Sequence, residues 1–197
     1  MHDTDTPTRR AEILTESRDF PFFRLIGLEI LDVEPARSSA QVNWRPDLRQ
    51  PVGLLHGGVV TSLIDTGTAY ALLLCDELRE TFQAGGSLVT IDLRVKYLRP
   101  VSGGSITCTS QVSRMGRQII HVDAVVTGHS TREVARSDAI YTTVTPNTSS
   151  SRPNRRRSVQ LIPERRPEIQ PGHGVRIVGT IAGRSLRPFR APDRCWG

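Results

Sequence analysis

Residues 54–65, with the sequence LLHGGVVTSLID, open an apolar run that continues to Leu74. From about Gly58 onward, this run is long enough for a helix of about four to five turns. Because apolar side chains occupy nearly every side of the helix, we expect protein to enclose it. Asp65 interrupts the run. An ionised carboxylate is costly to bury without a partner, so we expect Asp65 to be paired or to carry a function.

A narrow polar stripe surrounds Asp65 on the expected helix. Thr61, Asp65 and Thr68 are spaced by four and then three residues, which places their side chains on one side of a helix. Two interpretations fit this spacing. In the first, neighbouring hydroxyls or a partner chain hold Asp65 as a structural hydrogen-bond acceptor. In the second, the stripe lines a cleft.

The start of the helix carries a second unusual feature, the triplet His56-Gly57-Gly58. Glycines leave backbone N–H groups uncovered, and free N–H groups at a helix N-terminus bind anions or carbonyl oxygens. The triplet alone is also compatible with an ordinary turn. Together with the Gln50 amide upstream and the Asp65 carboxylate downstream, it supplies two donors for a carbonyl oxygen and a group that delivers or replaces water. These are the components of acyl hydrolysis.

Strand patterns flank this helix. Residues 19–27 suggest a short helix or turn, and residues 38–44 alternate apolar and polar side chains as a half-buried strand does. Three further strands are expected at residues 104–113, 118–127 and 134–144, with short turns that favour antiparallel meander pairing. The pattern predicts an α+β fold, with an antiparallel sheet wrapped around one long central helix.

The strand expected at residues 90–100 alternates strictly. Its apolar face carries four large side chains: Ile91, Leu93, Val95 and Tyr97. Thr90 and Asp92 belong to the opposite, polar face.

The charge of the chain is unevenly distributed. Its 197 residues carry a formal net charge of +6, but residues 1–146 carry −2 and residues 147–197 carry +8. We expect one domain at residues 19–146, after a polar segment at 1–18 and before a disordered tail at 147–197 that is rich in Arg, Pro and Ser. The basic tail permits contact with nucleic acid or anionic lipid. Because aromatic side chains for base stacking are sparse there, a dispensable extension is the favoured interpretation.

Neither a membrane segment nor a metal site is expected. The N-terminus lacks the apolar stretch of a signal peptide, and no apolar segment approaches the roughly 20 residues that span a membrane. Cys75, Cys108 and Cys195 lack metal-ligand spacing, and their odd number argues against a disulfide framework. We therefore expect a reduced, cytoplasmic protein.

Two segments, QPVGLLHGGVVTSLIDTGTAYAL and TIDLRVKYLRP, resemble the hotdog-fold acyl-CoA thioesterases of the phenylacetate-degradation (PaaI-like) and 4-hydroxybenzoyl-CoA thioesterase type. The resemblance extends from about Phe20 to Val144. Its motif is Asn or Gln, then Gly, then His-Gly-Gly, with Asp or Glu nine residues after the histidine. The resemblance implies a hotdog fold and hydrolysis of an acyl- or aryl-acyl-CoA to free acid and CoA. A non-catalytic acyl-CoA-binding module or sensor is the alternative.

The resemblance also implies roles for the residues of the motif. Gly57 N–H, helped by the Gln50 side chain, would bind the thioester carbonyl oxygen, and His56 would hold the loop by hydrogen bonding. Asp65 would be the nucleophile or the general base, and Thr90 would help to place the attacking water. Because such sites lie at a dimer interface, Asp65 and Gln50 would come from different subunits.

Coenzyme A would enter as part of the substrate, so no cofactor is implied. Gly58 and Thr68 are assigned to the substrate-binding surface. Arg99, Arg114 and Arg117 lie at expected strand ends, where guanidinium groups suit contact with CoA phosphates.

The resemblance implies a homodimer joined edge to edge by its sheets, commonly paired into a homotetramer. The apolar strand at residues 118–126 would be safest at a covered edge. His121 within that strand is expected to pack at an interface rather than to take part in catalysis.

Overall fold

The computed structural model describes residues 5–145, which form one six-stranded antiparallel sheet and four α-helices. The predicted tail at 147–197 lies outside the described residues. The strands are β1 (Leu28–Glu34), β2 (Arg37–Asn43), β3 (Ser87–Tyr97), β4 (Ser105–Met115), β5 (Ile120–Gly128) and β6 (Glu133–Val144). The helices are α1 (Asp5–Ser17), α2 (Pro21–Ile26), α3 (Gly57–Tyr70) and α4 (Asp76–Gln83), with a short 3₁₀ helix, η1 (Pro46–Leu48).

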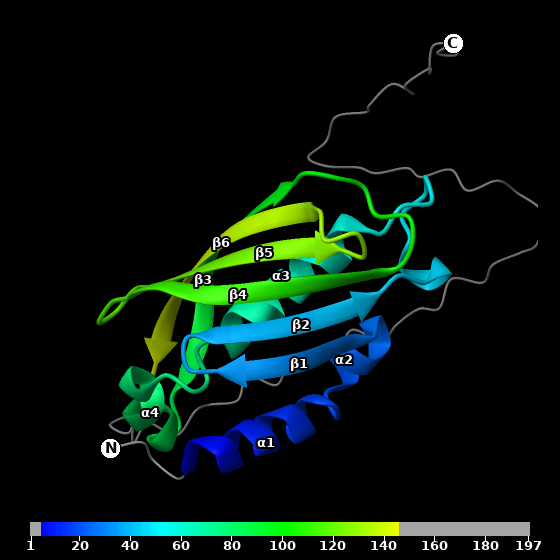
Figure 1. Ribbon diagram of the computed structural model, residues 1–197. Coiled ribbons are helices and arrows are strands. Elements are labelled where there is room, and N and C mark those ends of the chain that lie inside the picture. The colour runs from blue at the N-terminus through cyan, green and yellow to red at the C-terminus, as the bar shows by residue number, and fades with distance from the viewer. Residues whose placement is uncertain (1–4, 146–197) are drawn as a thin grey trace, which may run out of the picture. The chain divides into compact units, whose positions relative to one another are not determined.

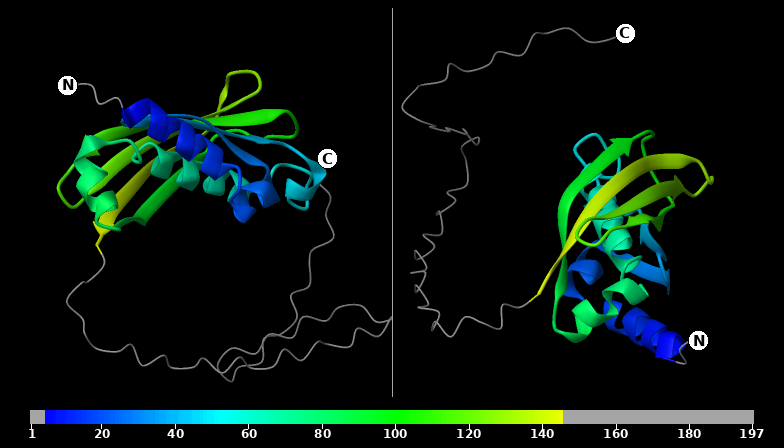
Figure 2. Two further views of the ribbon diagram at one scale, coloured as in Figure 1. Left: turned by 90° about the horizontal axis from the view of Figure 1, so that it is seen from below. Right: turned by 90° about the vertical axis from the view of Figure 1, so that its left-hand side faces the viewer.

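The sheet curls around α3, as the predicted α+β hotdog architecture requires. Its strand order is β1-β2-β4-β5-β6-β3 (Figure 1), and α3 lies against its concave side (Figure 2). Leu63 and Ile64 of α3 are completely buried. Gly67 allows the helix to approach β4 closely, because a Cβ there would lie 3.1 Å from both Cys108 Sγ and Ser110 Oγ. The apolar run is thus confirmed as a central helix.

The helix is shorter than its apolar run. It ends at Tyr70, and residues 71–74 form turns in which Leu72 N–H donates to Ala69 O at 3.1 Å. Ala71, Leu72 and Leu74 are nevertheless buried. The predicted end at Leu74 was therefore wrong. Residues 71–74 are apolar because neighbouring elements bury them, and not because the helix continues through them.

The strand order differs from the predicted meander in the position of β3. β4, β5 and β6 do pair in sequence, but β3 pairs with β6 and not with β4. The connection at residues 98–104 can cross the intervening strands because seven residues reach at most about 23–25 Å and three strand spacings span about 14 Å. The strand expected at residues 118–126 is β5, which lies between β4 and β6. Its expected edge position was wrong; the edges are β1 and β3.

A β-bulge in β3 changes which side chains face α3. The register with β6 shifts between Thr90 and Asp92, so Ile91 is the extra residue. Thr90 then shares the concave face with Leu93, whereas Ile91 is 51% exposed. The predicted placement of Ile91 and Thr90 was wrong, because strict alternation holds only in a strand without a bulge.

Two helices were not predicted. α1 covers β1, where its Ile13 packs with Val33 and Leu74, and Arg10 Nε donates to Asp32 Oδ1 at 2.8 Å. α4 buries mainly Leu78. Both helices bury few residues, so their composition resembles that of loops. No helix within residues 5–145 is long and apolar enough to cross a membrane.

Candidate active site

The loop before α3 is held by hydrogen bonds on both sides of His56. His56 N–H donates to Leu48 O at 2.8 Å. The His56 imidazole caps the helix, since its Nδ1 accepts from Gly58 N–H at 2.9 Å. A ring nitrogen that accepts carries no proton, so the neutral ring has its proton on Nε2. The predicted role of His56 in holding this loop agrees with this geometry.

The capping arrangement leaves one backbone donor available. Val59 N–H donates to His56 O at 3.0 Å, and Gly58 N–H donates to the imidazole. Within residues 5–145, Gly57 N–H has no hydrogen-bond acceptor. A free N–H at the N-terminus of a 14-residue helix is reinforced by the helix dipole, so it suits an oxygen that carries negative charge.

Gln50 lies in a tight turn beside this free donor. Its carbonyl oxygen accepts from Gly53 N–H at 2.9 Å, and Gly53 supplies the positive φ of 88° that the turn needs. Its side-chain Oε1 accepts from Val52 N–H at 3.4 Å, which leaves the Nε2 hydrogens for another acceptor. Gln50 and Gly57 line one cleft of about 490 Å³.

The cleft has polar and aliphatic walls. Its other lining residues are Leu54, Leu55, His56, Val60, Tyr97, Leu98, Arg99, Pro100, Val101 and Val134. Arg99 is anchored beside it, since Nη1 donates to Glu133 O at 2.6 Å. The structure therefore brings together Gln50, His56, Gly57 and Arg99 out of the predicted set.

Asp65 lies further along α3 and is half-buried. Its Oδ1 accepts from Thr90 Oγ1 at 3.0 Å, a contact made possible by the bulge in β3. The Tyr141 hydroxyl donates to the Asp65 backbone oxygen at 3.0 Å. Burial raises the pKa of Tyr141 to about 12, so this phenol stays a donor at neutral pH. Thus β3 contacts the carboxylate of Asp65, and β6 contacts its backbone.

Gly57 and Asp65 cannot act on one thioester within a single chain. They are eight residues apart on one helix, and a rise of about 1.5 Å per residue separates their backbones by about 12 Å. A reacting carbonyl must lie about 3 Å from both its donors and the attacking group. If both groups serve one reaction, the acid has to come from another copy of the chain.

Thr68 occupies a different environment from the one expected. It is completely buried, its hydroxyl donates to Ile64 O at 2.8 Å, and it lies 2.7 Å from the Tyr141 hydroxyl. A substrate contact needs access that this side chain lacks. Thr68 supports Tyr141 behind Asp65, and its expected place on the substrate-binding surface does not fit this position.

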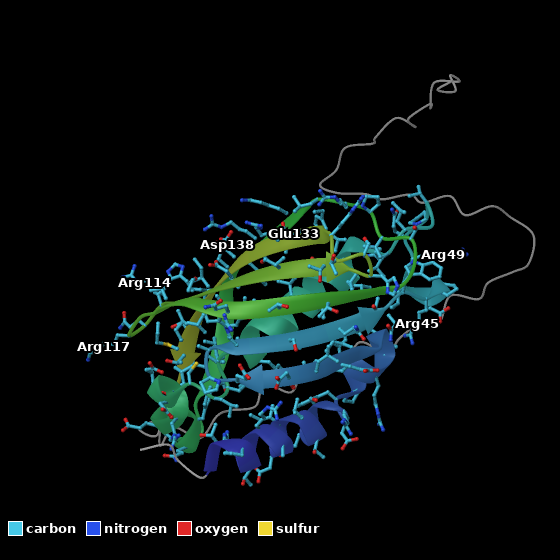
Figure 3. The ribbon with its side chains drawn as sticks, viewed as in Figure 1. Arg45, Arg49, Arg114, Arg117, Glu133 and Asp138 are labelled. Carbon is cyan, nitrogen blue, oxygen red and sulfur yellow. The ribbon has the colours of Figure 1, made fainter. Side chains whose placement is uncertain are left out.

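Arg114 and Arg117 lie apart from the cleft. Figure 3 shows them at one end of the sheet and Arg49, the neighbour of Gln50, at the other. With His121 they line a second cleft of about 640 Å³ at the turn between β4 and β5. Within one chain these arginines are therefore not beside Gly57.

Sequence reasoning missed two tyrosines. Tyr97 donates to Gly57 O at 3.1 Å, and Tyr141 holds the Asp65 backbone. Each had a signal: both belong to expected strands, and a tyrosine with a buried or helix-facing hydroxyl needs a polar partner. No group of three or more His, Cys, Asp or Glu side chains suited to a metal occurs in the described part of the chain.

Known proteins resemble this chain in sequence and in fold. Residues 52–135 match the family model of the thioesterase superfamily. The medium/long-chain acyl-CoA thioesterase YigI of Salmonella typhimurium is 32% identical over 133 residues, covering 61% of this chain and 84% of YigI.

Solved structures show the same fold. A thioesterase from Haemophilus influenzae has a TM-score of 0.59 at 24% identity, covering 68% of this chain and 90% of that chain. The PaaI protein of the Escherichia coli phenylacetic acid degradation operon has a TM-score of 0.59 at 20% identity, covering 72% and 95%. The family match and the extensive alignment with YigI together show the relationship: the chain belongs to the hotdog-fold acyl-CoA thioesterases of the thioesterase superfamily and is a thioester hydrolase.

Proposed function

We propose that the chain hydrolyses acyl-CoA thioesters to a carboxylic acid and CoA. The observation that carries this proposal is the Gly57 N–H at the start of α3, which has no acceptor among the described residues and lies in one cleft with Gln50. Hydrolysis of a thioester places negative charge on the carbonyl oxygen in the transition state, and two fixed donors stabilise that charge. The reaction needs no cofactor besides the CoA carried by the substrate.

The acid in this proposal is Asp65 of a second copy. Edge strand β3 has no partner on its outer side within the described residues, and Val89 and Ile91 on it are 40% and 51% exposed. An unpaired, partly apolar edge favours pairing with another strand. A two-fold axis at β3 would reverse the second copy, so that the partner subunit's Asp65 approaches Gly57 of this chain.

Two chemical routes fit a carboxylate at that position. As a general base, Asp65 takes a proton from water while the water oxygen attacks the carbonyl carbon. As a nucleophile, its own oxygen attacks, and water then hydrolyses the resulting anhydride. In both routes the carbon–sulfur bond breaks, and the CoA thiolate leaves and gains a proton. Thr90, bonded to Oδ1, orients the carboxylate in either route.

The cleft favours an aliphatic acyl group. Most of its apolar lining is Leu, Val and Pro, with Tyr97 as its one aromatic residue. This lining suits a medium- or long-chain acyl group, and the similar protein YigI is a medium/long-chain acyl-CoA thioesterase. The predicted CoA-phosphate contacts of Arg99, Arg114 and Arg117 stay predictions.

We also propose a cytoplasmic homodimer, paired further into a homotetramer. Cys75 and Cys108 are free and buried, which agrees with a reducing compartment. The edge of β3 provides the dimer contact described above.

A substrate panel tests the proposed function. Purified wild type should release free thiol from at least one acyl-CoA, and Asp65→Asn should lose at least about a hundredfold in kcat/KM. Asp123→Asn, the same change at an exposed residue of β5, is the control and should behave as wild type. Stabilisation of the wild type by acyl-CoA without any hydrolysis would instead favour a binding module.

Mixing two inactive variants tests the shared site. Gln50→Ala and Asp65→Asn, unfolded and refolded together, should recover about one quarter of wild-type activity, because each mixed dimer regains one intact site. Refolding each variant alone should recover none. Absence of recovery in the mixture would contradict a site built from two chains.

A further inference from the structure

Tyr97 lies against the residue that supplies the proposed carbonyl donor. It ends β3 and lines the same cleft as Gln50 and Gly57. Its side chain is not part of the core, since it is 55% exposed. Stability of the fold therefore does not explain why a tyrosine stands here, and its contacts with α3 become informative.

The Tyr97 hydroxyl belongs to a closed group of three oxygen atoms. It lies 3.1 Å from Gly57 O and 2.6 Å from Thr61 Oγ1. Thr61 Oγ1 also lies 3.1 Å from Gly57 O. Two hydroxyl protons serve these three oxygens: one bridges the hydroxyls, and the other points to the carbonyl. Neither hydroxyl then keeps a proton for the substrate.

The ring of Tyr97 also limits where Gly57 can move. A Cβ on Gly57 would lie 3.3 Å from both Cζ and the hydroxyl oxygen of Tyr97. The aromatic ring therefore packs directly on the side of Gly57 that a side chain would occupy. The His56 imidazole caps the next residue, because its Nδ1 accepts from Gly58 N–H at 2.9 Å, so both an imidazole and a phenol restrain the start of the helix.

We propose that Tyr97 is a positioning residue for thioester hydrolysis: it holds Gly57 so that its free N–H faces the reacting carbonyl oxygen. This inference rests on the proposed function of Gly57. An aimed donor matters most when charge develops on the carbonyl oxygen, because hydrogen bonds to a charged oxygen depend strongly on geometry. A change in the orientation of the Gly57 N–H should therefore lower kcat and leave substrate binding nearly unchanged.

Tyr97→Phe is the appropriate variant because it keeps the ring contact and removes only the hydroxyl. We expect kcat to fall about three- to tenfold, the effect of one lost hydrogen bond, with KM within about twofold of wild type. The shape of the pH–rate profile should not change, because Tyr97 donates no proton to the substrate. Tyr97→Ala should lower kcat further, since it also removes the ring.

Tyr70→Phe is the matched control. Tyr70 lies at the other end of α3, where its ring packs 6.0 Å from Phe23, and the same substitution there should leave kcat unchanged. Thermal melting of both variants shows whether the fold is retained.

Three results would overturn the assignment: wild-type kcat in Tyr97→Phe, a raised KM with unchanged kcat, or a lost limb of the pH profile. The last would make Tyr97 a proton donor. If the wild type hydrolysed no thioester, the proposed function would fail together with this assignment. A fully active wild type with an equally active Tyr97→Phe would overturn the assignment alone.

Discussion

Replacing Gly58 by alanine tests the capping geometry at the start of α3. The new Cβ would lie 2.9 Å from His56 Nδ1, closer than a Cβ approaches, and would make a tight contact of 3.2 Å with Cε1. The imidazole must move, and its 2.9 Å bond to the residue-58 N–H is lost. The peptide between His56 and Gly57 then loses one of the contacts that aim the Gly57 amide.

The expected effect on stability is small because two terms oppose each other. Loss of an N-cap lowers the free energy of unfolding by about 1 kcal/mol. Alanine in place of a helical glycine raises it by about 0.5–1 kcal/mol. The free energy of unfolding should therefore change by less than about 0.5 kcal/mol. Complete loss of one oxyanion donor lowers kcat about a hundred- to a thousandfold. We therefore expect a Gly57 N–H that is displaced but still present to lower kcat at least about tenfold.

The assay combines thiol release with urea unfolding, and it compares Gly58→Ala with Gly103→Ala. Gly103 has no atom within 4 Å of its added Cβ, so the same substitution there should leave kcat unchanged. Equal kcat values for the two variants would refute the view that the His56 cap aims the carbonyl donor. A large loss of stability in Gly58→Ala would refute the balance of the two energy terms.

Three further perturbations address the rest of the site. Thr90→Val keeps the shape of the side chain but removes the 3.0 Å bond to Asp65; kcat should fall about tenfold while the melting temperature stays close to that of wild type. Gly67→Ala should lower the free energy of unfolding in urea by about 1–3 kcal/mol, because its Cβ would meet Cys108 Sγ at 3.1 Å; unchanged stability would contradict the close helix–sheet contact. Tyr141 ionises near pH 12 in the folded chain against 10.0 as its ordinary value, so the unfolded state loses its proton first. Between pH 10 and 12 the free energy of unfolding of the wild type should then fall by about 2–3 kcal/mol because of this group. In Tyr141→Phe the free energy of unfolding should fall less steeply over the same range.

Much of the fold was predictable because its signals are local. Alternation of apolar and polar residues is a property of neighbouring residues, and it located the strands that became β2, β4, β5 and β6 within a few residues of their bounds. The apolar run after His56 likewise located α3. The glycine pair also predicted an available N–H at the start of α3, because a free N–H at a helix start depends only on the residues that form the turn.

Other features could not be predicted from the sequence because they depend on distant parts of the chain. Neither α1 nor α4 contains an apolar run, since α1 buries only Ile13 and Ser17 and α4 only Leu78. The position of β3 at the edge of the sheet depends on which strand pairs with it. The connection at residues 98–104 is compatible with pairing to β4 or to β6. A buried apolar turn after Tyr70 looks the same in sequence as one more turn of helix.

The residue types proposed for thioester chemistry, and their order along the chain, could be read directly from the sequence. Their arrangement in space was decided by tertiary structure. The bulge at Ile91 turns Thr90 toward Asp65, and pairing of β3 with β6 brings Tyr97 to Gly57 and Tyr141 to the Asp65 backbone. Hydrogen bonds between strands far apart in sequence set these contacts, and no local pattern of side chains encodes which strands will meet.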